Sequence, residues 1–254
     1  MFCNIIVTRP FDQVFTYKLK KGQTVKKGSV VNVPFGKAEN QIGMVMEVLD
    51  SVDNLSNYKI KSINNVYENI ILNQASIKFI EWVSNYTLTP IGLVLKLFLI
   101  NNKIISYQNT EKKIKVLNPT FIKLNAEQKK ASQLIKKKLF KNFQPIVLEG
   151  VTGSGKTEVF FDLMEEVFYK NRQTLIMVPE ISLTPQLENR FYERFGIHAD
   201  IWHSKISEKN RKNIWHRCYL GEPLFVIGAR SSLFLPFTKL GLIVVDEEHD
   251  TSYK

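Results

Sequence analysis

A glycine-rich stretch near the middle of the chain, Gly150-Val151-Thr152-Gly153-Ser154-Gly155-Lys156-Thr157, has the residue types that bind phosphate. It fits the pattern G-x-x-x-x-G-K-[ST] at every specified position. Glycines let backbone N–H groups converge on phosphate oxygens, Lys156 is expected to reach the β- and γ-phosphates, and the Thr157 hydroxyl is expected to bind Mg²⁺. The alternative is a strand–helix turn that binds nothing. The pattern favours a nucleoside triphosphate site made of Gly150, Thr152, Gly153, Ser154, Gly155, Lys156 and Thr157.

The elements around this loop are those that phosphate binding needs. Residues 145–149 form a short apolar run that predicts a buried strand, and residues 157–168 carry apolar side chains at helical spacing. A helix that begins at the loop adds the partial positive charge of its N-terminus to the site. We therefore expect a strand, the loop and a helix in that order.

A second motif lies downstream, where an apolar strand expected at 242–245 runs into Asp246-Glu247-Glu248-His249. Asp246 is expected to hold Mg²⁺, and Glu247 to orient or deprotonate the attacking water. A buried strand that ends in an acidic surface loop is the alternative, which the phosphate loop makes the weaker one. The predicted catalytic residues are Lys156, Asp246 and Glu247, and the predicted metal-binding residues are Thr157 and Asp246.

The bulk composition limits the class of protein. The 254 residues, 44% of them apolar, can build one large domain or two ordinary ones. We find neither an apolar run long enough to span a membrane nor a signal peptide, and two cysteines suit a reducing compartment, so a cytoplasmic location without membrane contact is expected. The net charge of +11 suggests a polyanionic partner. Residues 102–141 hold eleven Lys and two Glu, and a solvated linker remains an alternative there.

The pattern of elements indicates two domains. In residues 1–100, strands expected at 15–19, 29–36 and 42–48 between glycine turns indicate a small antiparallel barrel or sandwich, followed by helices at 73–86 and 89–99. Asn125 is expected to cap a helix, with Gln128 completing a capping box. From Pro145 onward, strands at 174–178, 201–203, 224–227 and 242–245 alternate with helices, which indicates a parallel sheet covered on both faces.

The acidic motif resembles the Asp-Glu-x-His box of superfamily 2 helicases, and the chain as a whole resembles the family of primosomal replication-restart helicases. The matching stretches are residues 150–159, 178–186, 203–204, 227–234 and 246–254. The resemblance implies a small β-rich 3′-end DNA-binding domain at 1–100, a basic linker at 101–122, and an α/β P-loop NTPase domain at 123–254. The last would be a RecA-like first helicase lobe with a mainly parallel sheet. The implied activity is ATP-dependent 3′-to-5′ DNA unwinding at arrested forks, with ATP and Mg²⁺ as cofactors.

The resemblance also implies roles for residues of the helicase lobe. Gln128 would recognise adenine, although its capping role is an equal alternative. Thr184 and Gln186 would donate hydrogen bonds to DNA phosphates, and Arg230 would lie near the bound strand. His249 would couple the nucleotide site to DNA.

In the N-terminal domain, the resemblance implies a pocket for the 3′ end of a nascent strand. Phe15 would stack on the terminal base, Gly36 would let the backbone approach the sugar, and Lys61 would contact a phosphate. Thr16 stands where the family often has an Asp that accepts from the 3′ hydroxyl. The alternative for Phe15 is an ordinary core position.

The implied partners are DNA, as forks, 3′ ends and single strands, together with primosome proteins and single-strand-binding protein. The family's winged-helix domain, second motor lobe and cysteine-rich zinc domain have no counterpart in these residues, so zinc is not expected here. We expect the chain to bind ATP·Mg and DNA, to hydrolyse ATP poorly and not to unwind. Two alternatives remain open: a non-catalytic DNA-binding fragment with a vestigial ATP site, and another superfamily 2 DNA translocase in repair.

Overall fold

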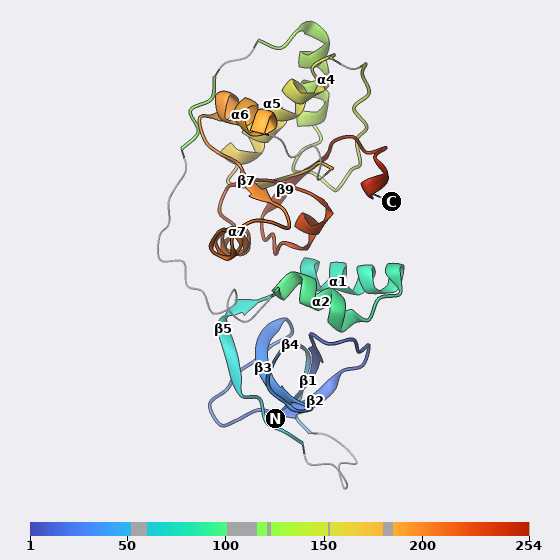
Figure 1. Cartoon of the computed structure of the whole chain (residues 1–254), viewed down its shortest axis with the longest axis vertical. Coiled ribbons are helices and arrows are strands. Elements are labelled where there is room, and N and C mark those ends of the chain that lie inside the picture. Colours follow the sequence, from blue (N-terminus) through green and yellow to red (C-terminus); the bar gives the residue numbers. More distant parts are fainter. Residues whose placement is uncertain (52–59, 101–115, 121–122, 152, 180–184, 254) are drawn as a thin grey trace. The chain divides into compact units, whose positions relative to one another are not determined.

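The computed structural model describes residues 1–51, 60–100, 116–120, 123–151, 153–179 and 185–253 (Figure 1). The chain divides into two compact units, residues 1–108 and residues 109–254, called below the N-terminal unit and the C-terminal unit. None of the helices in the described ranges has the length and apolar character needed to cross a membrane.

The N-terminal unit is built on an antiparallel sheet with the strand order β2-β1-β4-β3-β5. Alternate side chains of these strands, such as Ile5, Tyr17 and Val33, form the core on the inner face of the curved sheet (Figure 1). The small antiparallel domain predicted from the sequence is confirmed, although its first and last strands were not predicted. The strands are β1 (Phe2–Val7), β2 (Phe15–Lys18), β3 (Ser29–Phe35), β4 (Ala38–Leu49) and β5 (Asn65–Ile71).

Two helices, α1 (Gln74–Thr87) and α2 (Ile91–Leu99), follow the sheet of this unit. Asn73 begins α1, because its side-chain oxygen accepts a hydrogen bond of 2.8 Å from the Ser76 N–H. Gly92 fixes α2 against the end of β1: a Cβ at this position would overlap the carbonyl oxygens of Val7 and Arg9. Only glycine therefore allows α2 to pack this closely on β1.

The C-terminal unit is an α/β unit with a parallel sheet in the order β7-β8-β6-β9. The strands are β6 (Gln173–Met177), β7 (Asp200–Trp202), β8 (Phe225–Gly228) and β9 (Leu240–Val245). The helices are α4 (Ala126–Lys136), α5 (Lys156–Tyr169), α6 (Pro185–Phe195) and α7 (Glu208–Leu220), with short 3₁₀ helices η2 (Arg230–Phe234) and η3 (Thr251–Tyr253). The predicted alternation and parallel sheet are confirmed.

Helices cover both sides of this sheet (Figure 1). On one side, the rings of Phe161 in α5 and of Phe191 and Phe195 in α6 pack together, with centroids 4.6–5.9 Å apart. On the other side, α7 buries Trp215. The buried Gln173 amide ties α7 to β6 by donating to the Cys218 carbonyl at 2.8 Å.

The strand predicted for residues 145–149 is wrong. The structure has no strand there, and the Val147 side chain is 81% exposed. The apolar run is only Ile146-Val147-Leu148, and such a short run forms a strand only where a neighbouring strand supplies hydrogen bonds. Among the described strands, β9 is one of the two edge strands of the sheet, and its Ile243 and Val245 are 43% and 46% exposed.

The predicted basic linker, residues 101–122, lies largely outside the described residues. Its described part, 116–120, contacts the C-terminal unit, although Val116 is exposed. Leu117 is buried in the core with the α5 and α6 aromatics, and the Asn118 N–H donates to the Phe195 carbonyl at 3.1 Å. This end of the predicted linker is therefore part of the C-terminal unit.

Candidate nucleotide site and DNA-binding surfaces

The glycine-rich loop closes into a compact turn that leads into α5. Gly153 and Gly155 have φ angles of 79° and 78°, in the left-handed region that favours glycine. The Ser154 N–H donates to the Val151 carbonyl at 3.1 Å, and a Cβ on Gly150 would lie 2.6 Å from the Ser154 hydroxyl oxygen. The glycines are thus required by the shape of the loop itself. Thr152 lies outside the described residues.

Lys156 is the first residue of α5, and its side chain folds back over the loop. Its Nζ donates to the Gly150 carbonyl at 2.6 Å and to the Val151 carbonyl at 3.4 Å. A phosphate oxygen is a charged acceptor and makes a stronger hydrogen bond with an ammonium group than a carbonyl does. Thr157 follows in the first turn of the helix, where N–H groups and the helix dipole favour anions.

Gln128 caps α4 and also contacts the phosphate loop. The capping box is confirmed, with the Gln128 N–H donating to the Asn125 side chain and the Asn125 N–H donating to Gln128 Oε1, each at 2.9 Å. Its Nε2 also donates to the Ser154 carbonyl at 3.0 Å. Gln128 therefore joins the N-terminus of α4 to the phosphate loop.

The acidic box begins directly after β9. The Asp246 N–H continues the sheet by donating to the Met177 carbonyl at 2.9 Å, and Asp246 Oδ1 accepts from the Glu247 N–H at 3.1 Å. Glu247 has a φ of 52°, which is uncommon for a residue with a side chain and marks a sharp turn at this point. His249 Nδ1 lies 3.2 Å from Glu248 Oε2 within the same exposed loop.

The direction of α5 relative to β9 indicates where the phosphate loop lies with respect to the acidic box. Gly241 at the start of β9 lies against Val167 and Arg172 at the end of α5, so α5 runs antiparallel to β9. This direction points the N-terminus of α5, with Lys156, toward the edge of the sheet at which β9 ends in Asp246. The carboxyl edge of a parallel sheet is where ligands bind in open α/β folds.

The segments that follow the other strands begin at the carboxyl edge of the sheet. Met177, Gly228, Trp202 and Val245 are aligned at the carboxyl ends of the four strands. The residues that follow are Val178, Ala229 with Arg230, His203, and Asp246. Arg230, at the start of η2, is exposed, as is Gln186 in the first turn of α6. Thr184 lies outside the described residues.

Tyr253 is a residue of this region to which the sequence analysis gave no role. Its hydroxyl is buried and makes no hydrogen bond among the described residues. Burial, and then the negative charges of Asp246, Asp250 and Glu247, raise its pKa to about 12. Tyr253 therefore lies beside the acidic box as a neutral hydrogen-bond donor. No spacing rule connects it to the box, and only the resemblance of residues 246–254 gave a signal.

The predicted residues of the N-terminal unit fall into separate places. The Phe15 ring packs against Phe35 at a centroid distance of 4.9 Å and against Phe11 at 5.6 Å, and these three side chains are called below the aromatic cluster. Gly36 follows Phe35 with a φ of 57° and open space around it, and Lys61 is exposed. Phe15 also packs on the core, so its two alternatives are not exclusive.

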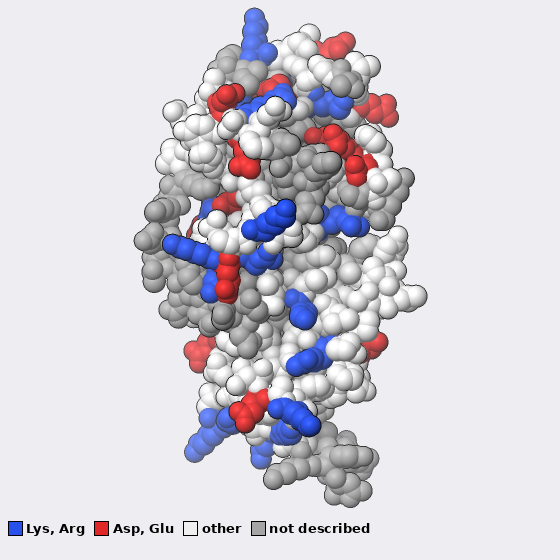
Figure 2. Space-filling model, in the orientation of Figure 1, with Lys and Arg blue, Asp and Glu red and all other residues white. Residues whose placement is uncertain are grey.

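Thr16 alternates with Phe15 along β2 and therefore points to the opposite face of the sheet. Its hydroxyl donates to Asn4 Oδ1 at 2.9 Å, and the Asn4 amide donates to Glu47 at 3.2 Å. The structure thus places the Thr16 side chain in a polar cluster and not in the aromatic cluster. Figure 2 shows basic and acidic side chains interspersed over the face in view, so the described charges there form no single basic surface.

Two family models match the chain. Residues 4–100 match the PriA model described as "3'DNA-binding domain (3'BD)", and residues 121–254 match the model "Type III restriction enzyme, res subunit". The second match covers more than half of the chain. The chain belongs to the type III restriction enzyme res-subunit family. Its C-terminal unit is therefore a helicase-like region that follows a 3′ DNA-binding domain.

Relatives named replication restart protein PriA resemble most of the chain. The protein from Rickettsia conorii (strain ATCC VR-613 / Malish 7) is 39% identical over 245 residues, which is 94% of this chain and 36% of that protein. The protein from Haemophilus influenzae is 37% identical over 207 residues, 81% of this chain and 26% of that protein. The predicted resemblance to replication-restart proteins is confirmed. The chain spans about a third of the length of the first of these relatives.

Proposed function

We propose that the chain forms the ATP-binding and 3′-end-binding part of an ATP-dependent 3′-to-5′ DNA helicase of replication restart. The observation that carries this proposal is a glycine loop with left-handed Gly153 and Gly155 that leads into α5, together with an acidic segment directly after β9, in a chain that also matches a 3′ DNA-binding domain. A phosphate-binding lysine and an acidic strand end are the two groups that nucleotide hydrolysis requires at one site. Such a protein would act in the cytoplasm on DNA forks, with primosome proteins and single-strand-binding protein as further partners.

The residues of the C-terminal unit fit ATP and Mg²⁺. The left-handed glycines of the loop leave backbone N–H groups free of side chains, and the loop ends at a helix N-terminus. Mg²⁺ is usually held by one or two protein oxygens together with phosphates and waters, so Thr157 and Asp246 would suffice. Bound Mg²⁺ would neutralise charge between the β- and γ-phosphates. Lys156 would bind the phosphates, Glu247 would orient the attacking water, and Gln128, which contacts the loop, would contact adenine.

The DNA contacts would come from both units. In the N-terminal unit, the aromatic cluster would hold the terminal base, with Gly36 and Lys61 beside it for the sugar and phosphate. In the C-terminal unit, Thr184, Gln186 and Arg230 would contact the strand, and His249 would couple it to the nucleotide site. Thr16, which faces away from the aromatic cluster, would contribute only after its hydrogen bond to Asn4 is broken.

The nucleotide site is tested by titrating the chain with a fluorescent ATP analogue in the presence and absence of Mg²⁺. Lys156→Ala should weaken binding at least about tenfold, since a hydrogen bond between charged groups is lost. Asp246→Asn should remove mainly the part of the affinity that depends on Mg²⁺. The matched control is Lys170→Ala, at the exposed far end of the same helix. Equal affinities in all variants would show that the loop binds no nucleotide.

The DNA-binding part is tested by fluorescence anisotropy with single strands that end in a 3′ hydroxyl or a 3′ phosphate. A preference for the 3′ hydroxyl, reduced by Phe15→Ala, is expected. Tyr169→Ala removes an exposed ring of the C-terminal unit and serves as the control, and circular dichroism verifies that each variant is folded. Binding that ignores the 3′ end would favour a general DNA-binding fragment over a helicase of replication restart.

A further inference from the structure

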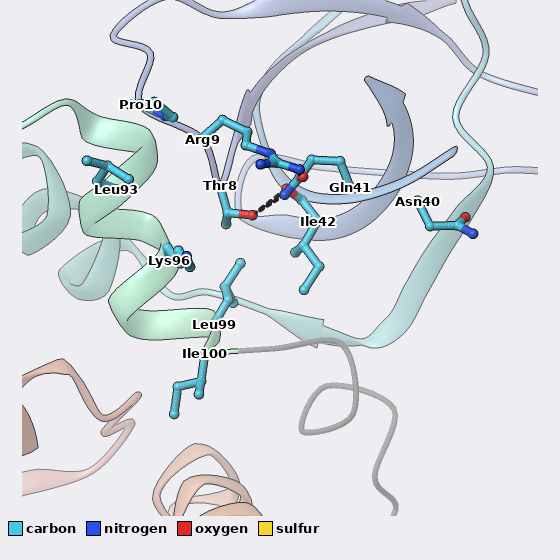
Figure 3. Close-up of a pocket in the computed structure, with 10 residues that line it drawn as sticks. All are labelled: Thr8, Arg9, Pro10, Asn40, Gln41, Ile42, Leu93, Lys96, Leu99 and Ile100. Atoms are coloured by element: carbon cyan, nitrogen blue, oxygen red, sulfur yellow. Dashed lines mark hydrogen bonds between the residues drawn. The ribbon is translucent and has the colours of Figure 1, made fainter. Parts of the chain in front are cut away.

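A pocket of about 370 Å³ lies in the N-terminal unit, where the end of β1, the middle of β4 and one face of α2 meet (Figure 3). Two of its lining residues, Arg9 and Lys96, are cations, and none is acidic. On the strand side the remaining lining residues are both polar and apolar, and on the helix side they are apolar, with Leu93 and Leu99. The predicted DNA-contact residues Phe15, Thr16, Gly36 and Lys61 are not among the lining residues.

A chain of hydrogen bonds holds the arginine of this pocket in place. Arg9 Nε donates to Gln41 Oε1 at 2.7 Å, Gln41 Nε2 donates to the Thr8 hydroxyl at 2.6 Å, and that hydroxyl donates to the Ile42 carbonyl at 3.1 Å. Figure 3 shows the Arg9 and Gln41 side chains turned toward each other over Thr8. Among the described residues, only Nε of the Arg9 side chain makes a hydrogen bond, so the two terminal nitrogens of the guanidinium can make a planar, bidentate contact with a phosphate.

The lysine of the pocket is placed by the close packing of α2. Gly92 allows α2 to touch the backbone at Val7 and Arg9, and Lys96 lies one turn further along the same face of the helix. Its ammonium group therefore belongs to the same pocket as Arg9, although the two residues are far apart in the sequence. Two cations above an apolar wall suit a ligand that has both a negative charge and apolar carbon atoms, such as a sugar-phosphate.

Short stretches of backbone connect the pocket to the aromatic cluster. Arg9 is two residues before Phe11, whose ring lies 5.6 Å from Phe15 and 5.5 Å from Phe35. Gln41 pairs with Val33, two residues before Phe35. We therefore expect one extended DNA strand to reach both the pocket and the aromatic cluster with neighbouring nucleotides.

We propose that this pocket binds a backbone phosphate of the single strand whose 3′-terminal base lies at the aromatic cluster. The inference rests on the proposed 3′-end binding and adds to it a second contact point, made by Arg9 and Lys96 with the sugar against Leu93 and Leu99. The aromatic cluster then binds the base and the pocket binds the charge. The sequence of the bound strand is not read by either contact.

The test uses the full chain and single strands with a 3′ hydroxyl, in which one phosphate at a time is replaced by a neutral methylphosphonate. In the unsubstituted protein, neutralising one phosphate linkage near the 3′ end should weaken DNA binding about tenfold. Arg9→Gln and Lys96→Gln should weaken binding of the unmodified strand by a similar factor and should lose their sensitivity to that linkage. Each should also lower the slope of log affinity against log salt by about 0.7.

The matched control is Lys78→Gln, which removes an exposed lysine of α1 in the same unit and should keep the pattern of the unsubstituted protein. If Arg9→Gln and Lys96→Gln behave like Lys78→Gln while 3′-ended strands still bind, the inference is overturned and the proposed function stands. If 3′-ended strands do not bind at all, both are overturned.

A free anion such as inorganic phosphate is the other ligand whose charge fits the pocket. Inorganic phosphate, added at constant ionic strength, should leave the methylphosphonate pattern unchanged. If it abolishes the pattern at low millimolar concentration, the pocket is a site for a small anion and the inference is overturned.

Capture of an acidic peptide by the pocket, with no effect of Arg9→Gln on DNA binding, would overturn the inference as well. Lys96→Gln lies outside the Arg9–Gln41–Thr8 hydrogen bonds, so it separates loss of charge from loss of local structure.

Discussion

Gln128 Nε2 donates a hydrogen bond of 3.0 Å to the carbonyl oxygen of Ser154, and so the cap of α4 and the phosphate loop share one side chain. In Gln128→Glu, the oxygen that accepts from the Asn125 N–H is retained, whereas the second oxygen has no proton to offer Ser154. We expect thermal stability to stay within a few degrees of the original and ATP affinity to fall about tenfold.

Two variants separate the roles of this side chain. Asn125→Ala removes the cap acceptor and should cost about 1 kcal/mol of stability while leaving the bond to Ser154 in place. Hydrogen exchange of the loop amides should increase in Gln128→Glu and not in Asn125→Ala. Unchanged loop exchange and ATP affinity in Gln128→Glu would contradict the prediction.

Arg217 forms a buried ion-pair cluster in the C-terminal unit, with Nη1 at 2.7 and 2.6 Å from the two Asp200 oxygens and Nε at 3.0 Å from a Glu222 oxygen. Arg217→Gln leaves two carboxylates close together without a cation. We expect a loss of about 3–5 kcal/mol in the free energy of unfolding, measured by urea titration with tryptophan fluorescence. Lys212→Gln breaks the Lys212–Glu208 pair on the same helix and should cost less than about 0.5 kcal/mol. Similar losses in the two variants would show that burial of the cluster does not matter.

Stability of the N-terminal unit should fall at alkaline pH. Burial raises the pKa of the Cys3 thiol from 9.0 to about 11 and that of the Tyr17 hydroxyl from 10.0 to about 12. Because the unfolded chain releases these protons first, their contribution is fully present below pH 9 and is lost as the pH rises through the folded values. Between pH 8 and pH 10.5, Cys3 alone should cost about 2 kcal/mol, which urea titrations at both pH values would measure. The same pH dependence in Cys3→Ala would rule out the thiol as its source.

Gly92→Ala should loosen the contact between α2 and β1. Alanine favours a helix by about 1 kcal/mol over glycine, but the added Cβ would overlap two backbone carbonyls that cannot move independently. We expect a net loss of about 1–3 kcal/mol in thermal or urea unfolding. Leu97→Ala, on the half-exposed face of the same helix, is the comparison and should cost less. A stabilised Gly92→Ala would mean that α2 does not need this close approach.

The parts of the fold that depend on neighbouring residues in the sequence could be predicted. Asn73 and Asn125 begin their helices as expected because a cap joins residues three positions apart. Helix α7 and strands β1 and β5 were not predicted. In α7, few apolar residues mark the buried face, and Arg217 is buried only because Asp200 and Glu222 surround it.

The candidate site also has a part that the sequence could predict and a part that it could not. The loop glycines and Lys156 form a local motif, and Gly153 and Gly155 have left-handed φ angles that favour glycine. The strand at 145–149 failed because a strand needs a partner that no local pattern supplies. The contact of Arg9 with Gln41 spans 32 positions and depends on the register of β1 with β4, so no spacing rule could have found it.

The outer edge of β9 is followed by no further strand among the described residues, and Ile243 and Val245 are about half exposed on it. Unsatisfied backbone groups beside apolar side chains are a template on which another extended segment can add. Purified samples should therefore become turbid first through this edge as they are concentrated. A storage buffer that keeps copies apart, by low protein concentration or by low salt at the net charge of +11, should keep the solution clear longest.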